Sequence, residues 1–342
     1  MVAVQFVVVL LRLLRLPLLT QSASPQTLSP DNVAMQGVIT PTRLIPETGP
    51  ASSRYLQQMP PLKPAKPLPP LVKRLAAETA GTALIVGGGC GAACALKDAT
   101  SASAYVMPIL WGVFVATAVT SFREASGAHF NPAVTLAFAL NNRDGGMANS
   151  RRDIGLYIAA QCFGATLASL AMAGWFAPQV AATQVIQPLM PLLSQSISEM
   201  SITALLVFCI FAIGDPDLHV PHELVPASVG VVITLINIGF GSFGIGLNPA
   251  RDLGPRLVAA FTGEFHLFEP GAWIYLIGPV FGAILGGYAY TTGSRYARSK
   301  LMVRRASADL RNQGVWGVVV PTEQSVRQSL EQSYPAPRPL SY

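Results

Sequence analysis

Two stretches of this sequence carry the same tripeptide, Asn-Pro-Ala: HFNPAVTLAF at residues 129–138 and IGLNPARDLGPRLVAAF at residues 245–261. Asn is a favoured N-cap residue. Pro suits the first helical position because its φ is preset and its missing N–H would have no partner there. Each stretch therefore predicts the start of a helix. The apolar run that follows is too short to cross a bilayer, which takes about 20 residues.

The composition predicts an all-α membrane protein. Hydrophobic residues make up 51% of the chain and charged residues only 12%, against about 25% charged in soluble domains. Six apolar runs are long enough to span; they lie near 75–96, 105–122, 155–177, 197–214, 224–242 and 272–292. Two shorter runs, near 132–140 and 249–261, begin at the Asn-Pro-Ala motifs.

The basic residues flank the apolar region, which argues against a nucleic-acid partner for this chain of net charge +6. Those before the first span and after the last are Lys63, Lys66, Lys73, Arg74, Arg295, Arg298, Lys300, Arg304 and Arg305. Basic flanks favour the cytoplasmic side, so we expect both termini there and an even number of spans. We expect the plasma membrane, with an organellar membrane as the alternative.

The chain divides into three parts. Residues 1–72 form an N-terminal extension with a Pro-rich segment, PPLKPAKPLPPL, and are expected to be disordered. The apolar beginning of this extension is also compatible with a signal or transit peptide. Residues 73–295 form the membrane domain, and residues 296–342 are expected to be a disordered, basic cytoplasmic tail.

The membrane domain has the pattern of a duplication. Glu78, in AAETAGTALIV, precedes the first motif by nearly the same distance as Glu199, in SEMSITALLVF, precedes the second. Each repeat, about 73–177 and about 197–292, has three spans and one half-helix. Because three is odd, the second repeat must enter the membrane inverted, an architecture in which broken helices meet at the midplane.

The paired motifs predict a pore. Non-helical backbone at the midplane is tolerated where it lines a wet cavity. Two capping Asn residues would still offer amide donors there, and two helix N-termini would repel protons and cations. The pore residues are predicted to be Asn131, Pro132, Ala133, Asn248, Pro249 and Ala250.

The motif stretches SGAHFNPAVT and GLNPARDLGPRL, together with AETAGT and YIAAQCFGA, resemble the aquaporin, or major intrinsic protein, family. The resemblance implies a six-span homotetrameric channel in which Glu78, Glu199 and His129 order the re-entrant loops. It also implies a selectivity filter, predicted at Trp111, Ile236, Ile245 and Arg251. A shift of one residue in the last part of the fifth span would put Leu235 or Asn237 in place of Ile236.

The filter favours a polyol channel. Water-selective relatives typically carry His where this chain has Ile236, whereas Trp and two Ile opposite one cation suit a solute with C–H surface. Asp252 and Arg256 resemble the aquaglyceroporin subgroup. We therefore expect passive conduction of glycerol and water, with urea and other small neutral solutes as further candidates and with ions and protons excluded. A water-selective pore and a coupled secondary transporter remain alternatives.

No pattern predicts an enzyme, a cofactor or a metal site. The sequence has no nucleophile–base pair, Cys/His cluster or phosphate loop. Arg123 and Glu124 are expected to form an ion pair at the cytoplasmic mouth. His219, His222 and Ser307 are candidates for gating by pH or phosphorylation.

Overall fold

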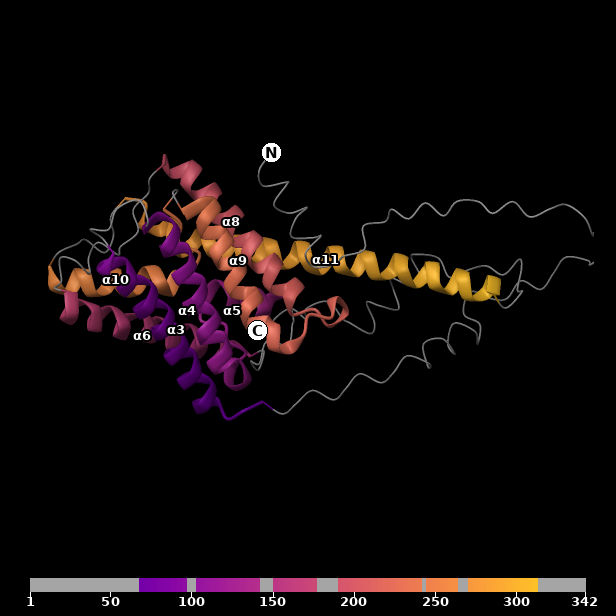
Figure 1. The fold of residues 1–342 in the computed structure, drawn as a ribbon, viewed down its shortest axis with the longest axis horizontal. Helices are drawn as coiled ribbons and strands as arrows, with labels where there is room; N and C mark the ends of the chain where they lie inside the picture. The colour runs from indigo at the N-terminus through magenta and orange to yellow at the C-terminus, as the bar shows by residue number, and fades with distance from the viewer. Residues whose placement is uncertain are drawn as a thin grey trace, which may run out of the picture. The chain divides into compact units, whose positions relative to one another are not determined.

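The computed structural model describes residues 68–96, 103–141, 150–176, 190–241, 244–263 and 270–312 (Figure 1). Within these ranges the regular secondary structure is helical. The long helices are α3 (Leu71–Ala95), α4 (Ser103–Ser126), α6 (Arg151–Phe176), α8 (Leu192–Ile213), α9 (Val225–Phe240) and α11 (Ala272–Asn312). The shorter ones are α5 (Pro132–Leu140) and α10 (Pro249–Thr262), with two 3-10 turns, η1 (Pro216–Leu218) and η2 (His222–Leu224).

The predicted fold class is confirmed: among the described residues, six long helices and two half-length helices occur in the expected order. Five segments of this part of the chain are long and apolar enough to cross a membrane, namely Tyr105–Ser126, Arg151–Phe176, Leu192–Ile213, His222–Phe240 and Ala272–Leu301. The sixth long helix, α3, has 25 residues. It falls outside that set because charged residues and five glycines dilute its apolar content.

The last helix continues beyond the predicted membrane domain. The sequence predicts a disordered tail from residue 296, whereas α11 is helical to Asn312. The extension RYARSKLMVRRASADLRN is rich in Arg, Lys, Ala and Leu, all good helix formers. Residues 63–302 belong to one compact unit and residues 303–312 to another; the site lies in the first. The N-terminal extension up to residue 67 lies outside the described residues.

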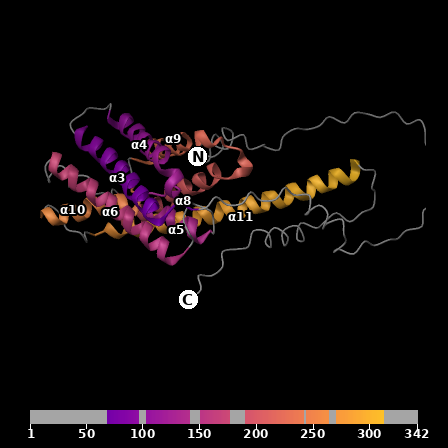
Figure 2. The same ribbon diagram turned by 90° about the horizontal axis from the view of Figure 1, so that it is seen from below.

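Small residues let the long helices approach closely, and they do so in the same way in both repeats. A Cβ on Gly164 of α6 would lie 2.2 Å from the carbonyl oxygen of Thr79, and one on Gly282 of α11 would lie 2.2 Å from that of Met200. Thr79 and Met200 directly follow the two Glu residues that defined the predicted repeats. Figure 2 shows α3 beside α4 and α6, the helices it packs against.

The second helices of the two repeats cross at a glycine pair. A Cβ on Gly112 of α4 would lie 2.5 Å from the carbonyl oxygen of Gly230 on α9, and one on Gly230 would lie 2.7 Å from that of Gly112. Each glycine stands four residues after a proline, Pro108 or Pro226. The reciprocal contact is what an inverted repeat requires at its pseudo-twofold axis.

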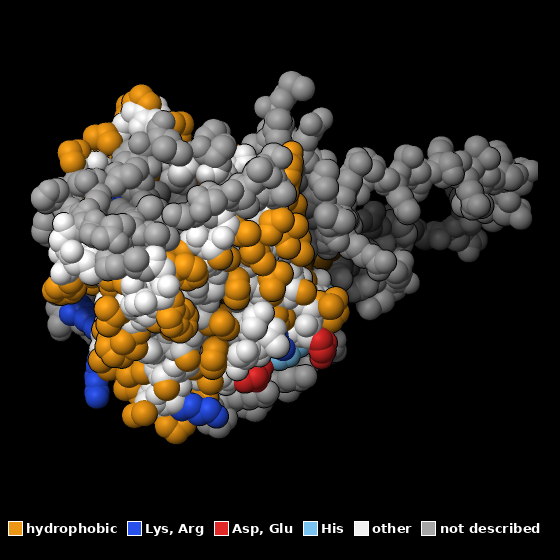
Figure 3. Space-filling view, turned by 60° about the vertical axis from the view of Figure 1, so that its left-hand side comes forward, with side chains coloured by type: hydrophobic (Ala, Val, Ile, Leu, Met, Phe, Trp, Pro, Cys, Tyr) orange, Lys and Arg blue, Asp and Glu red, His pale blue; other side chains and the backbone are white. Residues whose placement is uncertain are grey.

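The exterior of this unit is apolar. Large hydrophobic side chains such as Phe163, Leu170, Trp175 and Phe281 are more than half exposed. Figure 3 shows hydrophobic side chains spread over the described part of one face, with the few charged ones in its lower half. A surface of this kind suits contact with lipid.

Candidate functional site

The two Asn-Pro-Ala motifs start α5 and α10, which confirms the predicted helix starts. Asn131 has extended backbone, and its Oδ1 accepts a hydrogen bond from the amide of Ala133 at 2.9 Å. Asn248 does the same with the amides of Ala250 at 2.9 Å and Arg251 at 3.3 Å. Each motif's proline occupies the start of the helix, where it has no N–H to leave unpaired.

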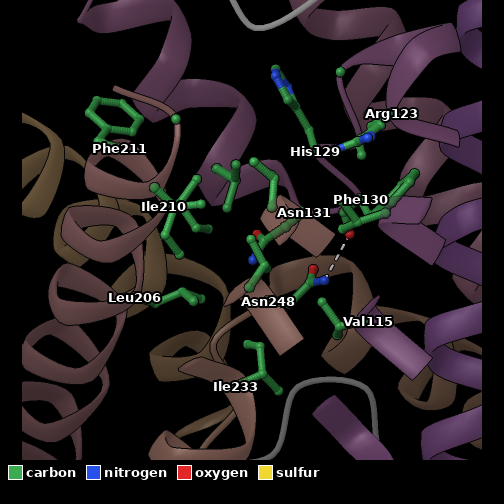
Figure 4. A pocket seen from close by; sticks show the side chains of 18 of the residues that line it. Val115, Arg123, His129, Phe130, Asn131, Leu206, Ile210, Phe211, Ile233 and Asn248 are labelled. Atoms are coloured by element: carbon green, nitrogen blue, oxygen red, sulfur yellow. Dashed lines mark hydrogen bonds between the residues drawn. The ribbon is translucent and has the colours of Figure 1, made fainter. Parts of the chain in front are cut away.

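The two motifs are joined by their side chains. Nδ2 of Asn131 donates to the carbonyl of Leu247 at 2.9 Å. Nδ2 of Asn248 donates to the carbonyl of Phe130, also at 2.9 Å (Figure 4). Phe130 and Leu247 have positive φ values of 50° and 61°, which are uncommon for residues other than glycine. The same strained turn therefore precedes each Asn, and it presents a carbonyl to the opposite motif.

Glu78 holds the loop before the first motif. Its fully buried carboxylate accepts hydrogen bonds from the hydroxyl of Ser126 at 2.6 Å and the amide of His129 at 3.1 Å on one oxygen. The other oxygen accepts from the amide of Phe130 at 2.7 Å and from Nε2 of Gln161 at 2.8 Å. Four donors thus fix a loop whose own backbone groups lack helical partners.

Glu199 and His129 contact the loops as well. The carboxylate of Glu199 accepts from the amides of Gly246 and Leu247, before the second motif. Nδ1 of His129 lies 3.2 Å from the hydroxyl of Thr135. Its ring stacks on Phe138 at a centroid distance of 4.7 Å. Both side chains therefore lie at the loops that the sequence predicts them to order.

Asn131 and Asn248 line a cavity of about 580 Å³. One wall is a stripe of α4 residues at a spacing of four, which places them on one helix face; it consists of Trp111, Val115, Val119 and Arg123. The facing stripe on α9 has the same spacing and consists of Val225, Val229, Ile233 and Asn237. The middle of both stripes is apolar, and Figure 4 shows Val115 and Ile233 near Asn248. The sequence alone does not predict that these Val and Ile side chains line the cavity.

Three of the four predicted filter residues line this cavity: Trp111, Ile245 and Arg251. The guanidinium carbon of Arg251 lies over the Trp111 ring, 5.3 Å from its centroid, within the range of a cation–π contact. The far edge of the indole rests on Gly89 of α3, where a Cβ would lie 2.2 Å from the ring. Gly89 therefore makes room for the ring.

The prediction for Ile236 is wrong. Its side chain is fully buried and does not line the cavity, because it falls one residue off the stripe that runs through Ile233. Asn237 lines the cavity instead. Counting back from Asn248 therefore gives the residue next to the one that lines the cavity. Asn237, the polar alternative to Ile236, is the α9 residue that lines it.

Asp252 and Arg256 lie behind the cavity wall. They form an ion pair of 2.7 Å within α10, and both are buried. Neither lines the cavity. The guanidinium carbon of Arg256 lies 5.9 Å from the ring centroid of Tyr275 on α11. Arg256 therefore contacts α11.

A charged cluster marks the other end of the cavity. Arg123 donates to the carbonyl of His222 and lies 2.9 Å, Nη2 to Nδ1, from its ring. Nε2 of His222 lies 3.1 Å from a carboxylate oxygen of Glu124. The predicted Arg123–Glu124 contact is present at 3.8 Å. No local pattern in the sequence signals the bond to His222, which is 99 residues away.

A second arginine holds the segment before His222. Arg298 of α11 contacts Asp215 through Nη2 at 2.7 Å and Asp217 through Nε at 2.6 Å. Tyr290 also donates to Asp215, at 2.7 Å. Nδ1 of His219 lies 2.7 Å from the carbonyl oxygen of Asp217. The Ser307 side chain lies outside the described residues.

Comparison with known proteins agrees with this architecture. A sequence model of the major intrinsic protein family matches residues 68–290. The chain is 34% identical over 223 residues to aquaporin NIP1-1 of Oryza sativa subsp. japonica, covering 65% of this chain and 74% of that protein. It is 31% identical over 223 residues to nodulin-26 of Glycine max, covering 65% and 78% respectively.

A solved structure is similar as well. The X-ray structure of the aquaglyceroporin from Plasmodium falciparum aligns with a TM-score of 0.57 and 25% sequence identity, covering 65% of this chain and 96% of that one. The family match over 68–290 agrees with the six long helices and the two half-helices that meet through their Asn caps. The chain is a multi-pass membrane protein that belongs to the major intrinsic protein family.

Proposed function

We propose that the protein is a passive channel for glycerol, other small uncharged polyols and water. The observation that carries this proposal is the Trp111–Arg251 pair at one end of the cavity. An apolar aromatic ring paired with a cation matches a polyol, whose carbon backbone can contact the indole while its hydroxyls accept from the guanidinium.

The walls further along support the same solute class. A fully hydrated ion would lose its water against Val115, Val119, Val229 and Ile233 with nothing to replace it. A polyol brings C–H surface to these side chains. Its hydroxyls can meet the two motif Asn residues, which line the cavity and cap two helices whose N-terminal ends carry partial positive charge. That charge disfavours protons and cations.

The similar proteins support a channel. The related chains are named as aquaporins, and the similar solved structure is that of an aquaglyceroporin. We further propose a homotetramer in the plasma membrane with both ends of the membrane domain in the cytoplasm. The basic residues before α3 and in the last turns of α11 support this orientation.

A water-selective pore is the second candidate. Asn237 favours it, because its polar side chain makes the cavity wall less apolar than an isoleucine at that place would. The two candidates differ in one measurable property, the permeability to glycerol relative to water.

Tracer uptake in proteoliposomes tests the proposal. Labelled glycerol should equilibrate across the membrane faster than in protein-free vesicles, and its rate should not change when a pH or sodium gradient is imposed. Uptake above equilibrium driven by either gradient would indicate a coupled transporter. Uptake no faster than in protein-free vesicles, with water flux raised, would leave the water-selective pore.

A further inference from the structure

The two repeats hold the first turn of their half-helices in different ways. In the first repeat the hydroxyl of Thr135, four residues after the motif Asn, accepts from Nε2 of Gln161 on α6 at 2.9 Å. Nδ1 of His129 lies 3.2 Å from the same hydroxyl. All three side chains are buried. The first turn of α5 is thus tied to α6 by direct contacts between side chains.

Asp252 stands at the place of Thr135 in the second repeat, four residues after the motif Asn. Its Oδ2 atom accepts from Nε of Arg256 at 2.7 Å. Its Oδ1 atom is buried, and within the described part of the chain it has no hydrogen-bond partner. A buried acceptor without a donor costs free energy, so this oxygen calls for one.

The side chains that supply donors in the first repeat have no equivalent in the second. Pro279 of α11 takes the place of Gln161, three residues before the glycine at which each third span packs closely. Gly246 takes the place of His129, two residues before the motif Asn. Neither replacement carries a polar side-chain group. Both exchanges also remove side-chain volume, part of which the long side chain of Arg256 refills.

A second buried polar group without a partner lies close by. Tyr275 of α11 and Tyr157 of α6 occupy equivalent places, seven residues before the glycine of close packing. The Tyr157 hydroxyl donates to the carbonyl of Ser126 at 3.0 Å. The Tyr275 hydroxyl is buried as well, but among the described residues nothing bonds to it. The guanidinium carbon of Arg256, the ion-pair partner of Asp252, lies 5.9 Å from the Tyr275 ring centroid.

We propose that a buried water molecule joins the Tyr275 hydroxyl to Oδ1 of Asp252 and so ties α10 to α11. The two atoms are complementary, because the hydroxyl donates to water and the carboxylate oxygen accepts from it. Both side chains contact Arg256, so they are neighbours. Buried waters in proteins bond to polar groups that lack other partners. The water site does not depend on which solute the channel conducts.

A structure of the full-length protein at a resolution that shows ordered water tests the site directly. We expect a density peak within hydrogen-bond distance of both the Tyr275 hydroxyl and Oδ1 of Asp252. The same peak should be lost in Tyr275→Phe, which removes only the hydroxyl. Wild-type protein without this peak would overturn the proposal, and so would a peak that Tyr275→Phe leaves in place.

Thermal unfolding in detergent tests it independently, because the sign of the effect differs. Removing a buried hydroxyl that has no partner is neutral or stabilising, whereas removing one that is hydrogen-bonded destabilises. We expect Tyr275→Phe to lower the unfolding midpoint by about 2–4 °C, the shift for one hydrogen bond in a domain of this size. Tyr157→Phe is the matched control, since its hydroxyl donates directly to a carbonyl, and it should lower the midpoint similarly. A midpoint of Tyr275→Phe equal to or above that of the wild type would overturn the water bridge.

Discussion

Arg251 lies over Trp111, with its guanidinium carbon 5.3 Å from the ring centroid. Arg251 follows the second Asn-Pro-Ala motif, whereas Trp111 belongs to α4 in the first repeat. The contact therefore joins the two repeats at one end of the cavity. The large aromatic ring of Trp111 narrows the cavity at that end.

Removing this ring should widen the range of solutes. We expect Trp111→Ala to raise the permeability to polyols larger than glycerol several-fold, because the indole no longer occupies the cavity. Light scattering in proteoliposomes with a series of polyols measures the effect. Trp175→Ala is a matched control, since Trp175 is 81% exposed on the outer surface. Identical polyol profiles for the two variants would contradict a filter role for Trp111.

The two buried carboxylates should differ in their effect on stability. Glu78 accepts four hydrogen bonds and Glu199 accepts two from the loop before its motif. Replacing a carboxylate by an amide puts N–H groups against backbone donors, at a cost of about 1–3 kcal/mol for each buried group left unpaired. We expect Glu78→Gln to lower the melting temperature in detergent more than Glu199→Gln does. The reverse order would contradict the hydrogen-bond assignment.

Close helix contact should make Gly164 sensitive to a single methyl group. A Cβ there would lie 2.2 Å from the carbonyl oxygen of Thr79, so Gly164→Ala should destabilise the protein by about 1–3 kcal/mol. Gly155, on the same helix, has no atom within 4 Å of a Cβ. Gly155→Ala should leave stability unchanged or raise it by up to about 1 kcal/mol. Thermal unfolding of the two variants checks this, and equal melting temperatures would contradict the predicted packing.

Arg298 should restrain the segment between α8 and α9. Its contacts with Asp215 and Asp217 join this segment to α11. We expect Arg298→Gln to speed amide hydrogen exchange across residues 214–221, because the segment loses these contacts. Arg295→Gln, almost one turn earlier on α11, is the control, since within the described part of the chain Arg295 forms no ion pair with this segment. Equal exchange rates in both variants would show that Arg298 does not hold it.

The half-helices could be predicted from the sequence because their signals are local. Asn caps a helix and Pro fits its first turn, so the start of α5 at Pro132 and of α10 at Pro249 follows from three residues. The end of α11 differs from the prediction although its signal is also local. A charged extension suggests a tail when charge alone is considered, but the helix propensity of its residues favours a helix to Asn312.

The α9 residue that lines the cavity next to the predicted position could not be obtained by counting. The count from Asn248 back to Ile236 crosses the turn after Phe240, whose path in space the sequence does not give. The helical spacing from Val229 through Ile233 to Asn237 is a better guide, because it depends on α9 alone. The contact of Arg123 with a histidine had no local signal either, since it joins residues 99 positions apart.

Light scattering of proteoliposomes tests the central proposal, glycerol conduction, most directly. Vesicles are first shrunk in an impermeant sugar to measure water flux, and their re-swelling in glycerol is then compared with that of protein-free vesicles. We expect both rates to rise with the protein present. Fast shrinkage with re-swelling no faster than in protein-free vesicles would contradict glycerol conduction and leave a water-selective pore.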